Sequence, residues 1–239
     1  MEENNSKPQT PHGVLDISYK DERINRKAFS YRLRRRADEV ILMINKHFKS
    51  DPRDLLDLGP AEGKSLSIVQ DAFPNMKCTG LEYSQELLEA CEDKRLTMIQ
   101  GDAMHPPFPD NSFDIVTATA VIEHVESPLE MIKEVNRILR PGGIFIITTP
   151  DPLFEKVAVA IGHLQDEDHQ ETMTLRTLKS YLSEADMEPV FLSKFMCWPW
   201  GFKGELVIER IIKAIGLRFI LLNQIAVGLK SVNSKGKEQ

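Results

Sequence analysis

Residues 55–63 read LLDLGPAEG, and this stretch decides the fold because an apolar strand runs into a glycine-containing turn. A helix is expected to follow the turn from about Lys64. Gly59 and Gly63 carry no side chain, so a ligand can approach the backbone of the turn closely. The start of the helix offers free N–H groups and the positive end of its dipole. The spacing Gly59-x-Ala61-x-Gly63 differs from the dinucleotide fingerprint G-x-G-x-x-G.

Short apolar runs alternate with helical patterns along the rest of the chain. The expected strands are residues 55–59, 78–82, 96–100, 113–120, 144–149, 190–196 and 225–229. The expected helices are residues 64–73, 85–92, 128–140, 174–186 and a last one that carries Ile208, Ile211, Ile212 and Ile215 as its apolar stripe. This alternation is typical of a parallel sheet with helices on both faces. The chain is therefore expected to form an α/β domain, a Rossmann-like doubly wound sheet of seven strands.

The domain is expected to span residues 51–232. Residues 1–20 and 233–239 are polar, without apolar periodicity, and are expected to be loose tails. Residues 21–50 show apolar side chains at helical spacing, which predicts an N-terminal helical extension. Ligands of a doubly wound sheet enter at the carboxyl ends of the strands, so this extension is expected to act as a lid.

Composition and charge exclude several classes of protein. The 239 residues are 41% hydrophobic and 28% charged, as in an ordinary globular domain. A net charge of -6 gives no general basic field, so DNA is excluded and RNA is not expected as a partner. The three cysteines form no C-x-x-C pair, and no metal site or disulfide framework is expected.

The compartment is expected to be the cytoplasm. The N-terminus, MEENNSKPQTPHG, is polar and lacks the apolar core of a signal peptide. The longest charge-free apolar run near the C-terminus, residues 219–229, is shorter than the roughly 18 to 20 residues that a membrane span needs. No transmembrane segment is therefore expected.

Carboxylates lie in, at the end of, or just after the first three expected strands. Asp57 lies within the first strand, and Glu82 ends the second, where a doubly wound sheet usually holds the ribose hydroxyls of a nucleotide. Asp102 follows the third strand, where an adenine amino group could donate to it. Each of these features alone could belong to an ordinary turn, but the glycine turn, Glu82 and Asp102, in this order at three strand ends, indicate a nucleotide-like ligand in one crevice.

These segments resemble the class I S-adenosylmethionine-dependent methyltransferases, and in particular the small-molecule methyltransferases of quinone biosynthesis. The resemblance covers about residues 50–190. It is carried by LLDLGPAEGK, GLEYS, GDAMHPPFPDNSFDIVTATAVIEHV and LRPGGIFIITTP. It implies a strand order in which the seventh strand runs antiparallel to its neighbours.

The resemblance also implies a set of residues that bind S-adenosylmethionine. The first motif is assigned to the methionine portion, Glu82 to the ribose, and Asp102 with Ala103 to the adenine. The chain departs from the family at Ala61, where a glycine is usual. The complete set is Asp57, Gly59, Pro60, Ala61, Gly63, Glu82, Tyr83, Asp102, Ala103 and Ala120.

The implied activity is transfer of the methyl group of S-adenosylmethionine to an oxygen, nitrogen or carbon nucleophile of a small molecule, which leaves S-adenosylhomocysteine. No N-P-P-Y-like motif follows the fourth strand, which argues against amide or base nitrogens as acceptors. Two alternatives remain: a non-catalytic protein that binds the same adenosyl ligands, and an NAD-dependent oxidoreductase. The missing G-x-G-x-x-G and the absence of a Tyr-x-x-x-Lys pair disfavour the oxidoreductase.

Candidate catalytic and substrate residues follow the fourth and later strands. His124 could act as a general base beside the sulfonium, or it could only shape the pocket, since methyl transfer needs mainly alignment. His163 and His169 lie in the long segment after the fifth strand and could line the substrate site. Trp198 and Trp200 could line an apolar pocket or cover the edge of the sheet.

Two stretches of the sequence could each bind a partner, but their pattern does not identify which one. Arg32, Arg34, Arg35 and Arg36 make the N-terminal helix basic. A solvated helix face explains such a run most simply, although it would also suit a phosphate-bearing substrate, an anionic membrane surface or RNA. Residues 206–229 could support peripheral lipid contact or dimerisation, but a core helix and a final strand are preferred. The protein is expected to be a monomer or a homodimer.

Overall fold

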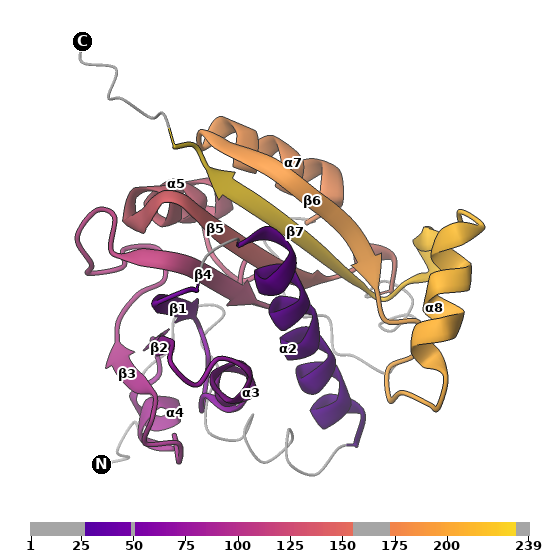
Figure 1. The fold of residues 1–239 in the computed structure, drawn as a ribbon, viewed down its shortest axis with the longest axis horizontal. Coiled ribbons are helices and arrows are strands. Elements are labelled where there is room, and N and C mark those ends of the chain that lie inside the picture. The colour runs from indigo at the N-terminus through magenta and orange to yellow at the C-terminus, as the bar shows by residue number, and fades with distance from the viewer. Residues whose placement is uncertain (1–26, 49–50, 155–172, 233–239) are drawn as a thin grey trace, which may run out of the picture.

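The computed structural model describes residues 27–48, 51–154 and 173–232. Seven strands form one sheet in the order β3-β2-β1-β4-β5-β7-β6 (Figure 1). The strands are β1 (Asp54–Leu58), β2 (Lys77–Glu82), β3 (Thr97–Gln100), β4 (Phe113–Thr119), β5 (Leu139–Pro150), β6 (Met187–Phe195) and β7 (Asn223–Lys230). β1 to β5 are parallel, and β7 runs antiparallel to both β5 and β6. The predicted Rossmann-like sheet with an antiparallel last strand is confirmed.

Helices cover both faces of this sheet, because its central strands are apolar on both sides. Ile146 of β5 packs in one apolar cluster, with residues of α2 (Lys27–His47) and α3 (Lys64–Ala72). Its neighbour Phe145 packs in the other cluster, with residues of α5 (Pro128–Ile138) and α7 (Leu175–Glu184). Successive side chains of a strand point to opposite faces, so an unbroken apolar strand requires a helical layer on each face. α4 (Gln85–Glu89) connects β2 to β3.

The carboxyl ends of the parallel strands form one rim of the sheet. The segment that joins β6 to β7 lies on the same rim. The last residue of β5, Pro150, pairs with Asn223, the first residue of β7, and Phe195 at the end of β6 pairs with the same residue. Residues 196–222 therefore leave and rejoin the sheet at this rim. They contain α8 (Glu205–Ala214) and the short helix η1 (Arg218–Ile220).

The N-terminal helix α2 is packed into the domain. Its side chains Met43 and Ile44 are each 1% exposed and belong to the apolar cluster that includes Leu55 and Ile144 of the sheet. Figure 1 shows the helix lying across the face of the sheet beside α3. The role of lid stays a prediction, and the described contacts make the C-terminal half of α2 part of the core.

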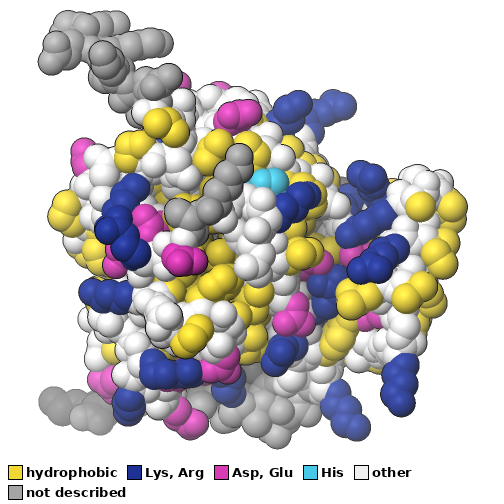
Figure 2. All heavy atoms as spheres, viewed as in Figure 1, with side chains coloured by type: hydrophobic (Ala, Val, Ile, Leu, Met, Phe, Trp, Pro, Cys, Tyr) yellow, Lys and Arg dark blue, Asp and Glu magenta, His cyan; other side chains and the backbone are white. Residues whose placement is uncertain are grey.

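Two expectations about surface and core are wrong. The stripe expected to be buried on α8 is exposed at Ile208 (43%), Ile211 (54%) and Ile215 (62%), and only Ile212 is buried. Apolar side chains accordingly gather over α8 at the right edge of Figure 2. The reason is that the helix turns its two glutamates, rather than its isoleucines, toward the domain. The basic run of α2 is likewise not a uniform solvated face, because Arg35 is 6% exposed and forms ion pairs with Glu39 and Glu209.

The packing of α2 predicts a specific loss of stability. Met43→Ala removes a buried side chain from the core and is expected to lower the free energy of unfolding by about 2 to 5 kcal/mol. Leu42→Ala is the matched control on the same helix, since Leu42 is 53% exposed, and is expected to change stability by less than about 0.5 kcal/mol. Urea denaturation measures both. Equal and small effects would show that α2 detaches from the sheet as a lid does.

Candidate functional site

The turn after β1 brings its backbone close to neighbouring elements. Gly59 has φ 64° and Gly63, at the N-cap of α3, has φ 78°, a left-handed conformation that favours glycine. A Cβ atom on Gly59 would lie 2.7 Å from Cγ2 of Val121. The glycine therefore allows the segment after β4 to close over the turn. Ala61 adopts φ 53°, so it occupies a left-handed position where a glycine would be relaxed.

Glu82 fixes this turn to the end of β2. One oxygen of its carboxylate accepts the N–H of Ala61 at 2.8 Å, and the other accepts the N–H of Ser84 at 2.9 Å. These two hydrogen bonds hold the side chain in one orientation. The residue is buried, with 7% of its surface exposed. Each carboxylate oxygen has a second lone pair, so the group can still accept hydroxyl hydrogen bonds from a ligand.

Asp57 is a buried carboxyl directly beneath the turn. The Thr117 hydroxyl donates to it at 2.7 Å. Burial raises the pKa of Asp57 to about 7, the Thr117 hydrogen bond acts in the opposite direction, and the charge of Glu82 adds to the rise. A carboxyl with a pKa of about 7 is partly protonated at neutral pH, and a nearby cation would favour its ionised form. The proximity of Thr117 was not predicted from the sequence, because it depends on the pairing of β4 with β1.

Asp102 lies on the same rim after β3. Its carboxylate accepts the N–H of Met104 at 2.8 Å and lies 3.1 Å from Nδ1 of His105. The Asp102 side chain remains 46% exposed, so part of it faces solvent. Ala103 is half-buried beside it against the apolar cluster. Tyr83, after Glu82, is 47% exposed.

The segment after β4 completes the rim. Ala120 has φ 59° and donates its N–H to the carbonyl of Thr148 at 2.8 Å, which holds the end of β4 against β5. His124 is half-buried and donates its backbone N–H to the carbonyl of Val121 at 2.9 Å. The structure thus brings the β1 turn, Glu82 and the Ala120 turn together. The roles assigned to the individual residues stay predictions.

The four residues predicted to line the substrate site lie in two different segments. His163 and His169 lie outside the described residues. Trp198 and Trp200 lie in the connection after β6, are 48% and 51% exposed, and contact each other edge to face with ring centroids 5.6 Å apart. Both are therefore partly exposed surface residues, and a place in the substrate site stays a prediction.

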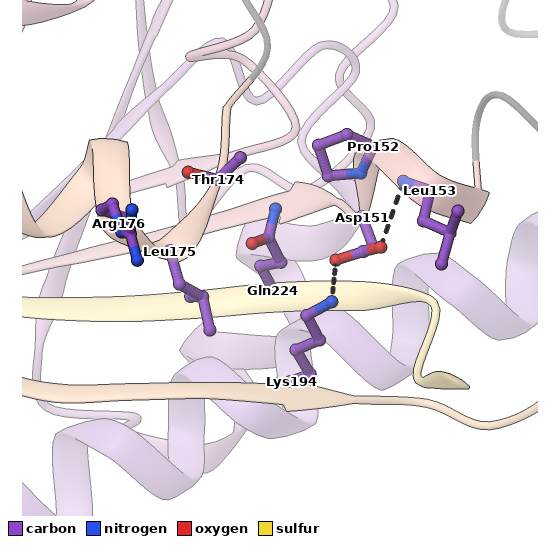
Figure 3. A pocket seen from close by; sticks show the side chains of 8 residues that line it. All are labelled: Asp151, Pro152, Leu153, Thr174, Leu175, Arg176, Lys194 and Gln224. Carbon is purple, nitrogen blue, oxygen red and sulfur yellow. Dashed lines mark hydrogen bonds and ion pairs between the residues drawn. The ribbon is translucent and has the colours of Figure 1, made fainter. Parts of the chain in front are cut away.

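A hollow of about 350 Å³ lies at the carboxyl end of β5 (Figure 3). Lys194 forms an ion pair with Asp151 across it, and Asp151 also accepts the N–H of Leu153 at 3.1 Å. The lining residues are Asp151, Pro152, Leu153, Thr174, Leu175, Arg176, Lys194 and Gln224. None was predicted from the sequence, because they come from four separate segments and form no local motif.

Two further properties concern only the part of the chain that the structure describes. Within residues 27–48, 51–154 and 173–232, no group of three or more histidine, cysteine, aspartate or glutamate side chains could hold a metal ion. None of the described helices is both long and apolar enough to span a bilayer.

Residues 56–147 match the methyltransferase domain family. A demethylmenaquinone methyltransferase of Staphylococcus haemolyticus is 31% identical over 168 residues, which cover 66% of this chain and 69% of that protein. One of Staphylococcus aureus is 28% identical over 164 residues, which cover 61% of this chain and 62% of that protein. The matched part thus spans about two thirds of the length of these relatives.

The solved structure of an S-adenosylmethionine-dependent methyltransferase from Thermotoga maritima superposes with a TM-score of 0.62 at 19% identity, over 90% of this chain and 97% of that one. At this identity the likeness shows the fold. The three comparisons, by family, by sequence and by fold, all point to a methyltransferase. The chain belongs to the class I S-adenosylmethionine-dependent methyltransferases, in the group that includes the methyltransferases of quinone biosynthesis.

Proposed function

We propose that this protein transfers a methyl group from S-adenosylmethionine to an oxygen, nitrogen or carbon nucleophile of a small molecule held at the carboxyl rim of the sheet. The observation that carries the proposal is the arrangement of the turn after β1. The Glu82 carboxylate accepts the N–H of Ala61 in this turn, and Val121, next to Ala120, packs against Gly59 on its other side. This arrangement leaves backbone N–H groups and an oriented carboxylate at one crevice. Since the curated relatives are named demethylmenaquinone methyltransferases, quinol-like aromatic hydroxy compounds are the first acceptors to test.

The residues at the rim fit the chemical groups of this cofactor. The glycine turn, with Pro60 and Ala61, would receive the methionine portion, and Asp57 would face its ammonium group. Glu82 and Tyr83 would hold the ribose, and Asp102 and Ala103 would hold the adenine. The cofactor supplies an electrophilic methyl group on a positively charged sulfur, which the acceptor displaces directly.

The chain itself would contribute alignment, exclusion of water and a place for the proton of the acceptor. Val121 and Ala120 would close the crevice over the turn, because Val121 already packs against Gly59. We propose His124, which follows on the same segment, as the base that accepts the proton. The hollow beside Asp151 and Lys194 is proposed as part of the wall that holds the acceptor.

We propose further that the protein works in the cytoplasm as a monomer or homodimer and does not act on nucleic acid. The net charge of -6 supports the last point, because a phosphate backbone would be repelled by most of the surface.

Glu82→Ala tests the proposed ribose contact. Loss of the carboxylate is expected to weaken S-adenosylhomocysteine binding by about 1 to 3 kcal/mol, roughly 5- to 150-fold. Calorimetric titration measures this, with NAD as the ligand control and the exposed Glu86→Ala as the matched variant. Thermal denaturation of both variants separates lost binding from lost folding. Unchanged affinity in a folded Glu82→Ala protein would overturn the assignment.

The buried carboxyl of Asp57 predicts how binding depends on pH. Its pKa of about 7 means that the ligand-free protein keeps this proton at mildly acidic pH. An ammonium group favours the carboxylate, so binding below pH 7 releases the proton. The affinity for S-adenosylhomocysteine should therefore rise with pH, at most about tenfold per pH unit, and level off above about pH 7. Asp57→Asn should bind more weakly and lose this dependence, and an identical pH profile in the variant would contradict the proposal.

His124→Ala tests the proposed base. With an acceptor in hand, turnover is expected to fall by about 100-fold or more, because a positioned base contributes on that order. The dissociation constant of S-adenosylhomocysteine should stay within about twofold of the original. A variant that loses affinity but keeps its turnover would instead assign His124 to the shape of the pocket.

A further inference from the structure

The connection between β6 and β7 carries most of the exposed large hydrophobic side chains of the described residues. Of their 15 exposed large hydrophobic side chains, 11 fall between residues 198 and 220. We call this the 198–220 surface. Scattered single apolar side chains are normal on a protein surface, but a contiguous patch marks a site of interaction.

Helix α8 is inverted relative to an ordinary surface helix. Its carboxylates Glu205 and Glu209 are only 4% and 3% exposed, whereas Leu206, Ile208 and Ile211 are 56%, 43% and 54% exposed. A surface helix normally buries its apolar stripe and leaves its charges in water. Here the apolar stripe faces outward, so the helix presents it to something other than the core of this domain.

Specific contacts hold the helix in this orientation. One carboxylate oxygen of Glu209 accepts from the Arg35 guanidinium at 2.8 Å and from the N–H of Met196 at 3.0 Å. The other oxygen accepts from Lys213 at 2.6 Å. Glu205 accepts the N–H of Cys197 at 3.1 Å and the hydroxyl of Tyr31. Lys213 belongs to α8 itself, but the other partners belong to α2 or directly follow β6. The outward direction of the isoleucines is therefore built into the fold.

The charges on this surface have one sign. The exposed charged residues between 198 and 220 are Lys203, Arg210 and Arg218, while the two acids of the segment are the buried glutamates. Figure 2 shows Lys and Arg side chains beside the apolar ones at this edge of the molecule. In a protein of net charge -6 the patch is therefore a local exception. A second copy of the chain fits it poorly, because cations would meet cations.

An apolar surface with only cationic charges is complementary to a bilayer of anionic lipids. Amphipathic helices that lie at a membrane surface combine an apolar face with Lys and Arg, and anionic headgroups attract the cations. Tryptophan prefers the boundary between headgroups and acyl chains. Trp198 and Trp200, both about half exposed and in contact with each other, belong to the same surface.

We propose that the 198–220 surface binds the face of an anionic phospholipid bilayer, with the outward side chains of α8 and both tryptophans in the headgroup region. Lys203, Arg210 and Arg218 contact lipid phosphates. The surface lies on the same rim of the sheet as the proposed cofactor crevice, so docking would turn that rim toward the membrane. This inference does not depend on methyl transfer, since it concerns binding alone.

Vesicle binding by the full chain tests the proposal. Phosphatidylcholine vesicles with and without phosphatidylglycerol are used for co-sedimentation and for tryptophan emission. The chain has only two tryptophans, both in the surface, so emission reports on the surface directly. We expect binding and a blue shift with phosphatidylglycerol, both weakened by added salt. Absence of sedimentation and of any shift would overturn the proposal.

Variants locate the binding. Ile208→Ser with Ile211→Ser should reduce binding at least tenfold, whereas Leu42→Ser, at an exposed position of α2, should not. Arg210→Glu with Arg218→Glu should remove the preference for phosphatidylglycerol. Lys77→Glu with Lys179→Glu makes the same change in net charge at exposed positions elsewhere and should retain it. Circular dichroism confirms folding. An equal loss of the phosphatidylglycerol preference in both charge variants would contradict lipid docking. A blue shift that appears without vesicles, as the protein dimerises with rising concentration, would contradict it as well.

Discussion

The position of β1 between β2 and β4 is the constraint on which the site depends. Leu58 at the end of β1 pairs with Leu81 on one side and with Ala118 on the other. After β1 the chain adds β2 and β3 on one side of it, and it then crosses over to add β4 and β5 on the other side. In a doubly wound sheet this reversal opens a crevice at the carboxyl ends of the strands. Glu82 and Ala120 reach the same turn because their strands flank β1.

The crevice is maintained at some conformational cost. Ala61 and Ala120 have φ 53° and 59°, and left-handed backbone at a residue with a side chain costs on the order of 1 kcal/mol or more. Each of these residues donates its N–H to a fixed acceptor, Glu82 Oε2 at 2.8 Å and the Thr148 carbonyl at 2.8 Å. The hydrogen bonds offset the strain and keep the backbone in place. Strained residues held by neighbouring elements are common where a fold is organised around a ligand.

A second organising interaction links segments that are far apart in the chain. Arg35 of α2 and Glu209 of α8 form a buried ion pair, which ties the first described helix to the connection before the last strand. Burial would raise the pKa of Glu209, but Lys213 and Arg35 lower it below its ordinary value. The carboxylate is therefore charged inside the protein, and the apolar side of α8 is left on the outside. The unusual surface of the molecule is thus a consequence of its internal electrostatics.

Much of the fold could be predicted from the sequence because the relevant patterns are local. The alternation of strands and helices, the glycine turn at residues 59–63 and the acids at 82 and 102 each lie within one short segment. Their meeting at one rim also follows, since parallel strands end on the same side. The antiparallel direction of β7 was implied by the resemblance to the methyltransferases and is present in the sheet.

The tertiary structure alone decided which face of each element is covered. The spacing of Ile208, Ile211 and Ile215 defines a helical stripe, but its exposure depends on the Arg35 partner of Glu209, 174 positions away in the chain. The pKa of Asp57 similarly depends on Thr117 and Glu82, and the hollow beside Lys194 on segments that meet only in the folded sheet. Periodicity along a chain specifies the existence of an apolar face. The energies of burial and of charge pairing between distant segments determine the direction in which that face points.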